Sequence, residues 1–360
     1  MTIRPRLTPA IADVRRAVRT ALAAALPTAA ESTEPTERAE QADPTDPTGP
    51  TASDRPLVLV ALSGGADSLA LAAATAFEAP RLGLRAGAVI VDHRLQPGSA
   101  DAAADAARAA AALGLDPVLV REVTVDGTGG PEAAARDARY AALDSALTDT
   151  GAIRLLLGHT LDDQAETVLL GLARGSGASS LWGMSRESGH YLRPLLGIRR
   201  RATEQACADA GLDPWHDPQN VDSSYARVRV RQRVLPTLES ELGPGVAEAL
   251  ARTAEQLRED AEALDHFASE IIEELAEPAE AGISLPVAAL AANPPALRQR
   301  LIRLAVRAEF HVSLGRAHTL EVARLVTEWH GQVQRTLPGV RVERRHGLIV
   351  FSAGAIHPHG

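Results

Sequence analysis

The chain has 360 residues, of which 45% are apolar and 23% are charged, a composition that predicts a globular protein with a sizeable core. All 37 basic residues are arginine, which excludes a P-loop lysine, a Schiff-base lysine and a lysyl-adenylate nucleophile. The single cysteine, Cys207, excludes internal disulfides, CxxC redox pairs, thiolate zinc sites and iron–sulfur clusters. No apolar run approaches the roughly 20 residues that a membrane span needs. We therefore expect no membrane association and a cytoplasmic protein.

Residues 1–27 carry arginines along a helical pattern of apolar residues. A compact apolar region followed by a cleavage signal is missing, so the pattern does not favour a secretory signal. A transit peptide is the alternative that we favour less. We interpret the segment as a solvated amphipathic helix.

Residues 28–55 are rich in Pro, Thr, Ala and acidic residues, with seven acids against two arginines. They therefore contribute −5 to the formal net charge of −9. A segment with so little apolar content does not bury enough surface to offset its ordering entropy. It is predicted to be a disordered acidic linker.

Residues 56–237 alternate apolar runs with helical patterns. The runs have the length of buried strands and lie at 56–62, 86–91, 116–123 and 152–158. The helical patterns between and after them cover 67–77, 99–113, 131–147 and 162–173. This alternation predicts an α/β fold with a parallel sheet covered on both faces. Ligands bind such sheets at the carboxyl ends of the strands.

Residues 238–360 are predicted to form a smaller, mostly helical second domain. Helical periodicity covers 246–275, a stretch from Pro294 to Phe310, and 318–330, and a hairpin is expected over 340–352 around His346 and Gly347. Between 296 and 346 ten arginines face four glutamates, a local net charge of +6. A basic domain on an acidic chain is compatible with RNA binding, because affinity for phosphates follows the local field.

The segment Ser63–Ser68 joins the first predicted strand to its helix. Its two glycines let the backbone approach a polyanion, and the amides at the helix N-terminus suit a phosphate chain. Asp67 is placed to hold Mg²⁺ against those phosphates, since Mg²⁺ prefers one or two carboxylates plus substrate oxygens. The simpler alternative is an ordinary glycine turn with an Asp at the helix start.

This SGGxDS segment resembles the PP-loop of the N-type ATP pyrophosphatases, which split ATP into AMP and pyrophosphate. Further segments match in order and spacing, and over about 56–240 the chain resembles the tRNA(Ile)-lysidine synthase family. The segments are Val91–Leu95, Pro131–Tyr140, Gly158–Thr167, Arg174–Gly177 and Arg193–Leu196. A looser resemblance to the family's accessory substrate-binding region covers 331–351.

The resemblance implies a PP-loop ATPase fold of the adenine nucleotide α hydrolase type and an ATP-dependent ligase. Such an enzyme adenylates C2 of the wobble cytidine of tRNA(Ile) with the anticodon CAU. Free L-lysine then displaces AMP to give lysidine, and the codon read changes from AUG to AUA. The implied co-substrate is ATP with Mg²⁺, and a homodimer is left open.

The resemblance also implies roles for individual residues. Asp163 and Glu166 lie three residues apart on one helix face and would bind or deprotonate the lysine. Arg139 would face negative charge that develops on the phosphates or on cytidine O2, and His159 lies at the sheet edge. The ATP-binding residues would be Ser63, Gly64, Gly65, Ala66, Asp67, Ser68, Asp92 and His93.

Each of these residues also has a simpler structural interpretation. The acid pair fits an exposed first turn favoured by the helix dipole, with Asp162 as its cap. Arg139 fits a surface residue beside Arg136, and His159 fits a buried structural histidine. The sequence around Asp92 and His93 also fits a plain strand end.

Residues 227–233 place an arginine at every second position. These arginines would lie on one side of an extended segment, or along a helix start, and such an array suits tRNA phosphates and a flipped cytidine. By resemblance Arg231 lies nearest the lysine or the α-phosphate. The family usually has RNRIR where this chain has RVRVR, so Val228 replaces an Asn. A solvated basic stripe is the alternative, and the four residues concerned are Arg227, Arg229, Arg231 and Arg233.

Two other functions are alternatives to the ligase. A tRNA thiolase of the same superfamily needs catalytic cysteines or a cluster, which one cysteine inside a predicted helix (202–210) does not supply. A nucleotide-binding module without catalysis would not need the acid pair, yet Asp163 and Glu166 are present.

Overall fold

The computed structural model describes residues 7–26, 55–94, 98–124, 131–175, 178–279, 282–331 and 334–354. Apart from Arg55, the predicted acidic linker lies outside these ranges. The chain forms two compact units, residues 1–175 with 180–252, and residues 176–179 with 253–360. Their boundary falls inside one long helix, α9 (Val246–Leu275). Within the described ranges, no helix is long and apolar enough to cross a membrane.

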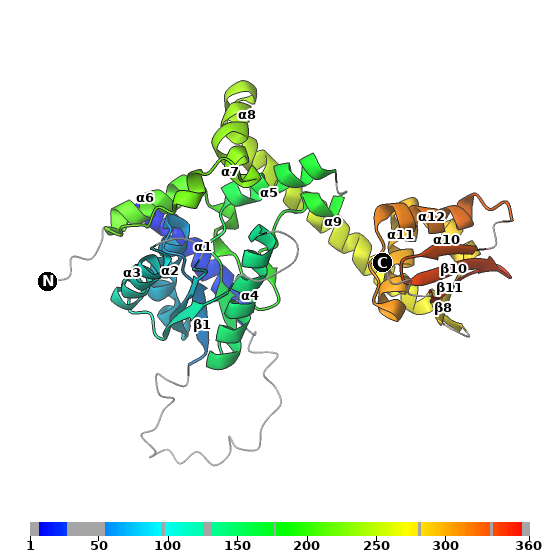
Figure 1. Ribbon diagram of the computed structural model, residues 1–360, viewed down its shortest axis with the longest axis horizontal. Helices are drawn as coiled ribbons and strands as arrows, with labels where there is room; N and C mark the ends of the chain where they lie inside the picture. Colours follow the sequence, from blue (N-terminus) through cyan, green and yellow to red (C-terminus); the bar gives the residue numbers. More distant parts are fainter. Residues whose placement is uncertain are drawn as a thin grey trace, which may run out of the picture. The chain divides into compact units, whose positions relative to one another are not determined.

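The first unit carries the labels α1 to α8 and β1 in Figure 1. It is built on a six-stranded sheet with the order β3-β2-β1-β4-β6-β5. The pairings β3–β2, β2–β1, β1–β4 and β4–β6 are parallel, and β5–β6 is antiparallel. The predicted parallel α/β sheet is therefore confirmed. The strands are β1 (Leu57–Ala61), β2 (Arg85–Asp92), β3 (Val118–Glu122), β4 (Arg154–Leu156), β5 (Glu187–Ser188) and β6 (Tyr191–Leu192).

Helices cover both faces of this sheet. Side chains alternate along β1, so Val58 and Val60 enter a core with α1, α2, α3 and α6, whereas Leu57 and Leu59 pack against α4. The helices of this unit are α1 (Pro9–Ala25), α2 (Ala66–Glu78), α3 (Ser99–Ala112), α4 (Pro131–Thr150), α5 (Leu161–Arg174), α6 (Arg200–Ala210), α7 (Ala226–Arg229) and α8 (Leu235–Leu242).

Helix α1 differs from its prediction as a solvated helix. Its apolar face is buried against α2 and α6, with Val18 at 0% and Leu22 at 1% exposure. In addition, Arg19 of α1 forms an ion pair with the buried Glu78 of α2. The sequence showed the amphipathic pattern but not the surface that would cover it, because both partner helices lie far along the chain.

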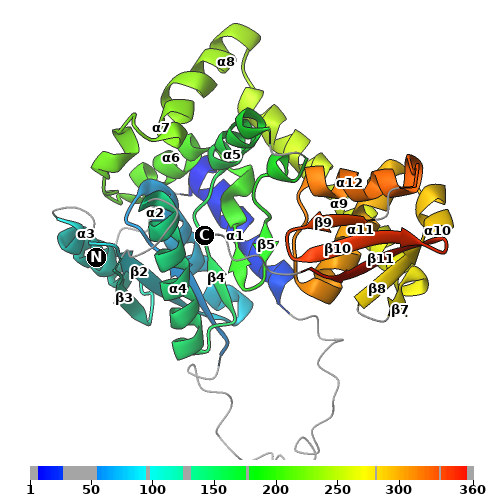
Figure 2. The same cartoon turned by 45° about the vertical axis from the view of Figure 1, so that its right-hand side comes forward.

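The second unit contains a five-stranded antiparallel sheet with the order β7-β8-β11-β10-β9 (Figure 2). The hairpin predicted over 340–352 is present as β10 and β11, and its turn contains His346 and Gly347. Strands β7, β8 and β9 were not anticipated. The elements are β7 (Glu277–Ala279), β8 (Gly282–Pro286), α10 (Val287–Ala292), α11 (Pro295–Phe310), α12 (Arg316–Thr327), β9 (Gln334–Leu337), β10 (Val340–Arg345) and β11 (Leu348–Ala353).

Candidate functional site

The phosphate loop, Ser63–Ser68, follows β1 and opens α2. Gly64 has a φ of +84°, which a residue with a Cβ rarely adopts, so glycine is required there. The Ser68 hydroxyl accepts from the Ser63 amide at 3.1 Å and donates to the Gly65 carbonyl at 3.0 Å. The loop is thus closed by contacts among its own residues. The first amides of α2, from Ala66 onwards, have no acceptor within the helix and face the position that an anion would take.

The end of β4 lies directly against this loop. A Cβ on Gly158 would come within 3.0 Å of the Cα and the amide nitrogen of Ser68. Only glycine therefore lets the strand end approach the start of α2 so closely. Strands β1 and β4 are neighbours in the sheet although β2 and β3 come between them in the chain. Such a switch point is where parallel sheets bind ligands.

Helix α5 begins at this switch point and directs Asp163 into the site. One carboxylate oxygen of Asp163, Oδ2, accepts hydrogen bonds from the Thr160 amide and the Thr160 hydroxyl, both at 2.8 Å. These bonds fix the side chain at the start of the helix, as in a capping box. The other oxygen, Oδ1, is left to face the site.

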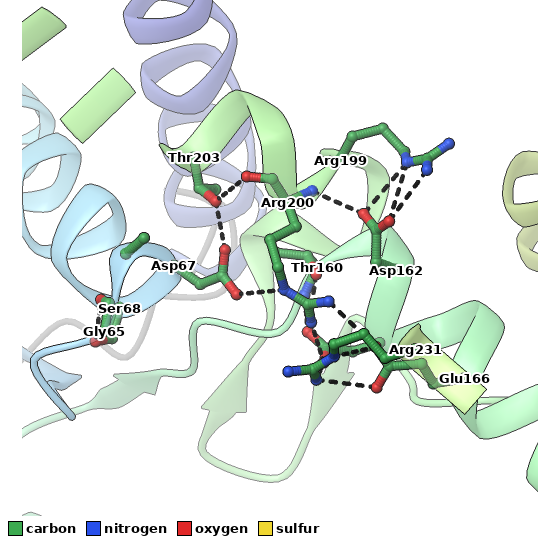
Figure 3. A network of polar contacts seen from close by, with 12 residues as sticks. Gly65, Asp67, Ser68, Thr160, Asp162, Glu166, Arg199, Arg200, Thr203 and Arg231 are labelled. Atoms are coloured by element: carbon green, nitrogen blue, oxygen red, sulfur yellow. Dashed lines mark hydrogen bonds and ion pairs between the residues drawn. The ribbon is translucent and has the colours of Figure 1, made fainter. Parts of the chain in front are cut away.

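Arg200, at the first position of α6, bridges the acidic groups from both motifs (Figure 3). Its Nε donates to Asp67 at 3.2 Å, one terminal nitrogen donates to Asp163 Oδ1 at 2.7 Å, and the other donates to Glu166 at 3.1 Å. The hydroxyl of Thr203 also donates to Asp67.

Arg231 completes the group from the helical segment after α7. Its Nε and one terminal nitrogen donate to the two carboxylate oxygens of Glu166 at 2.7 and 3.1 Å, a bidentate pair. Glu166 itself is 0% exposed. We call Asp67, Asp163 and Glu166, with Arg200 and Arg231, the carboxylate cluster.

The environment shifts the acidities of two of these carboxyl groups in opposite directions. Burial raises the pKa of Asp67 to about 6, against the opposing effects of Arg200 and Thr203. Burial acts in the same sense on Asp163, but Arg200 and the Thr160 donors outweigh it and hold the pKa of Asp163 below its ordinary value. Asp163 is therefore an anion suited to holding a cation.

Two further side chains beside the cluster, Arg139 and His159, have lowered pKa values. Burial lowers the pKa of the half-buried Arg139, and the guanidiniums of Arg136 and Arg227 lower it further. Burial also lowers the pKa of His159 to about 4, with Arg193 and Arg139 acting in the same sense and Asp163 opposing them. His159 is thus a neutral imidazole, and its buried Nδ1 has no hydrogen-bond partner among the residues that the structure describes.

Comparison with known proteins identifies the family. A PP-loop domain matches residues 37–238, and a TilS substrate binding domain matches residues 285–349. The tRNA(Ile)-lysidine synthase of Leifsonia xyli is 65% identical over 304 residues, which cover 84% of this chain and 90% of that protein. The enzyme of the same name from Thermobifida fusca is 54% identical over 300 residues, covering 82% and 92%. The chain belongs to the tRNA(Ile)-lysidine synthase family.

A solved structure supports the fold alone. The U34-tRNA thiolase NcsA from Methanococcus maripaludis, which carries a [4Fe-4S] cluster, matches with a TM-score of 0.51 and 19% identity. The match covers 69% of this chain and 80% of that one.

The arginine array of this family member is helical and not extended. Helix α7 continues into a π-helical turn over Val230–Val234, so alternate residues point in different directions. Arg227 and Arg231, four positions apart, face α5: Arg227 donates to Thr167 at 3.2 Å and lies 3.9 Å from Glu166. Arg229 instead donates to backbone carbonyls of Ser223 and Ser224, and Arg233 is exposed. Val228, where the family usually has Asn, is buried.

Asp92 and His93 end β2 beside this site. One oxygen of the buried Asp92 accepts from the Arg94 amide at 2.9 Å, which is the strand-end role left open as an alternative. His93 is half-buried, and within the described part of the chain its Nδ1 has no hydrogen-bond partner. Burial lowers its pKa, and Arg139 lowers it further. The fold thus places His93 within the influence of Arg139.

Sequence reasoning missed Arg200 and Thr203 and gave Asp162 the wrong role. Asp162 does not cap α5, because Thr160 occupies that position. Its carboxylate accepts from the Arg200 amide at 2.7 Å and so caps α6, and it also pairs with Arg199. The sequence did contain a signal for the role of Arg200. Three arginines at 199–201 open a helix, and the helix dipole disfavours cations at that end unless carboxylates lie nearby.

Proposed function

We propose that the protein catalyses ATP-dependent ligation of free L-lysine to C2 of the wobble cytidine in tRNA(Ile) with the anticodon CAU. The products are lysidine in the tRNA, AMP and pyrophosphate. The observation that carries the proposal is the meeting of the phosphate loop and the acidic face of α5 at the β1–β4 switch point. The phosphate loop suits a nucleoside triphosphate, and the acidic face of α5 suits an amine.

The phosphate loop would bind the triphosphate of ATP through Ser63, Gly64, Gly65, Ala66 and Ser68. Cytidine O2 attacks the α-phosphorus, a bond from O2 to that phosphorus forms, and pyrophosphate leaves. In this role the first amides of α2 offset the negative charge on the phosphates. Asp92 and His93, at the end of the neighbouring strand, would border the adenosine.

Asp67 fits a Mg²⁺ ion that is shared with ATP. It offers one partly exposed carboxylate at the mouth of the loop, and Mg²⁺ commonly takes one or two carboxylates plus phosphate oxygens. The described residues contain no group of three or more His, Cys, Asp or Glu side chains suited to a metal, so the donor set is that of a shared ion and not of a protein cage. When bound, the ion would neutralise phosphate charge.

Arg139 and His159 would line the position of the reacting cytidine. A half-buried guanidinium faced by Arg136 and Arg227 is well placed to meet negative charge on O2 and on the α-phosphate. The neutral imidazole of His159 would contribute a polar ring without a positive charge beside the base or the phosphate.

Asp163 and Glu166 would bind the lysine substrate, with Arg231 orienting Glu166. The lysine side-chain ammonium loses a proton to solvent, the resulting amine attacks C2 of the adenylated cytidine to form a C–N bond, and AMP leaves with the O2 oxygen. A carboxylate whose pKa is held below its ordinary value is a better anchor for an ammonium than a base. We therefore assign binding, and not proton removal, to Asp163.

Two alternatives are less well supported. A thiolase would need a reactive thiol, but Cys207 is buried in α6 and burial raises its pKa to about 12. A binding module without catalysis gives no reason for a fully buried Glu166 beside the phosphate loop.

The test is a labelling reaction with purified protein, ATP, Mg²⁺, labelled lysine and unmodified tRNA(Ile) bearing CAU. A methionine tRNA with the same anticodon is the control. We expect label in the isoleucine tRNA alone. AMP release without label would retain the adenylating loop and reject lysine as the nucleophile, and the absence of both would reject the enzyme assignment.

A further inference from the structure

Arg200 occupies the space in which the proposed cations would have to bind. Each of its three guanidinium nitrogens donates to a different carboxylate, namely Asp67, Asp163 and Glu166 (Figure 3). One of these carboxylates comes from the phosphate loop and two come from α5. Arg200 thus spans both halves of the site with a single charge.

The contacts of Asp163 and Glu166 leave little room for a further cation. Asp163 Oδ2 is taken by Thr160, and Oδ1 accepts from Arg200 at 2.7 Å. Both oxygens of Glu166 are bound by Arg231, and one of them also accepts from Arg200. A substrate ammonium therefore reaches these carboxylates only after Arg200 withdraws.

The charge balance leads to the same requirement. The cluster holds three carboxylates against its two guanidiniums, and a third guanidinium, that of Arg227, lies 3.9 Å from Glu166. An added ammonium would therefore meet carboxylates whose charge is already balanced, at close range in a partly buried site. Withdrawal of the Arg200 side chain frees an acceptor on each of the three carboxylates. The metal ion and the amine can then bind without a third cation, the Arg200 guanidinium, close to them.

We propose that Arg200 is a built-in competitor that couples the binding of the metal–nucleotide to the binding of the amino substrate. Whichever substrate binds first bears the free-energy cost of displacing Arg200, and the second then meets vacated carboxylates. The two substrates therefore bind with positive coupling, and the coupling is reciprocal. This inference rests on the proposed function, because it takes lysine as the amine and Mg²⁺·ATP as the nucleotide.

The side chain of Arg200 can move away from the three carboxylates without leaving them unpaired. Its side chain is 18% exposed, and Thr203 holds Asp67 from the neighbouring turn of the same helix while Arg231 holds Glu166. The carboxylates therefore keep other donors when Arg200 moves. Its backbone amide stays fixed by Asp162 at 2.7 Å, so only the side chain has to change conformation.

The test measures the lysine dissociation constant by calorimetry with and without saturating Mg²⁺ and a non-hydrolysable ATP analogue. For the wild type we expect lysine to bind at least about fivefold more tightly when the analogue is present. For Arg200→Gln we expect this ratio to fall below about two, and the nucleotide-free affinity for lysine to exceed that of the wild type. Arg201→Gln, an exposed arginine on the same helix, serves as the matched control and should keep the wild-type ratio.

Arg200→Lys covers the case in which the Gln variant does not fold. A single ammonium does not present three nitrogens to three carboxylates, so we expect a ratio between those of the wild type and a fully uncoupled site. A wild-type ratio in either Arg200 variant, or a ratio of one in the wild type, would overturn the proposal. The labelling reaction separates this failure from a wrong function: a wild type that labels tRNA(Ile) without coupling refutes only the role of Arg200.

Discussion

The phosphate loop and the carboxylate cluster share Asp67 but are built in different ways. The loop is closed by contacts within six residues, from Ser63 to Ser68, and one positive φ at Gly64 sets its shape. The cluster joins side chains more than 130 residues apart, such as Asp67 and Arg200. The loop needs only the end of β1 and the start of α2, whereas the cluster exists only after α5, α6 and α7 have packed.

The two halves of the site therefore differ before any substrate binds. The phosphate loop already has the shape that its ligand needs, whereas the carboxylate cluster is occupied by the protein's own guanidiniums. The loop presents amides toward an anion and has little to rearrange before a nucleotide binds. The cluster satisfies its carboxylates with its own guanidiniums, and so an incoming cation has to replace a contact that already exists. Variants that damage one half and spare the other test this contrast.

Asp67→Ala should have the largest effect, because Asp67 is the one carboxylate that belongs to both halves. We expect a loss of tRNA-dependent AMP release of about 100-fold or more. The fold should persist, since burial raises the pKa of Asp67 to about 6 and its charge is therefore costly in the folded protein. Turnover and thermal midpoint measure the two effects, with the exposed Asp137→Ala on α4 as the control. Full turnover in Asp67→Ala would refute the assignment of the loop.

Glu166→Gln should damage the cluster and spare the loop. It removes the charge that pairs with Arg231 and Arg200, so we expect the KM for lysine to rise at least about tenfold while the KM for ATP changes little. Glu248→Gln, which disturbs only the outer pair with Arg199, is the matched control. An equal rise in both KM values would show that the two halves do not separate at this residue.

Gly158→Ala should damage the loop and spare the cluster. The added Cβ would lie 3.0 Å from Ser68 and push the start of α2 away, and overpacking of this kind costs about 1–3 kcal/mol of stability. We expect the KM for ATP to rise by several fold, and the KM for lysine to rise less. At Gly197 the nearest atom to an added Cβ is 3.7 Å away, so Gly197→Ala is the control. A wild-type KM for ATP would show that the close approach does not shape the loop.

Substitution of His159, which lies between the phosphate loop and the carboxylate cluster, should have the smallest effect. We expect to see it in the pH dependence of the free energy of unfolding. Its pKa is lowered to about 4 in the folded protein, against about 6.5 for an unfolded histidine. As the pH falls from 6.5 toward 4, the unfolded chain takes up a proton that the folded protein does not, so the wild type loses stability by on the order of 1 kcal/mol per pH unit.

His159→Asn lacks this term, so the stability of the wild type relative to the variant should shrink over the same range. Urea unfolding of both proteins at pH 7.5, 6 and 5 measures the difference. A difference that stays constant with pH would show that His159 is not held neutral by burial.

Local patterns in the sequence determined the first four strands of the first unit, the helices after them and the phosphate loop, whereas the short strands β5 and β6 were not anticipated. Apolar runs and helical periodicity placed β1, β2, β3 and β4 and the helices after them close to their observed bounds. They sufficed because strand length, helix capping and the conformational freedom of Gly64 are set by near neighbours. For the same reason the hairpin of β10 and β11 was predictable, whereas the small sheet around it was not: β7, β8 and β9 are short and are defined mainly by pairing with distant strands.

Only the tertiary structure decided which charges meet. The sequence indicated Asp163 and Glu166 as a pair, but it did not show that these two residues and Asp67 are the carboxylates that Arg200 meets. It equally did not show that Arg227 and Arg231 would turn toward α5 while Arg229 turns away. The position of a charged side chain in the sequence does not indicate which residue it will pair with. Coulomb attraction depends on distance in space and on burial, and both are established only by packing.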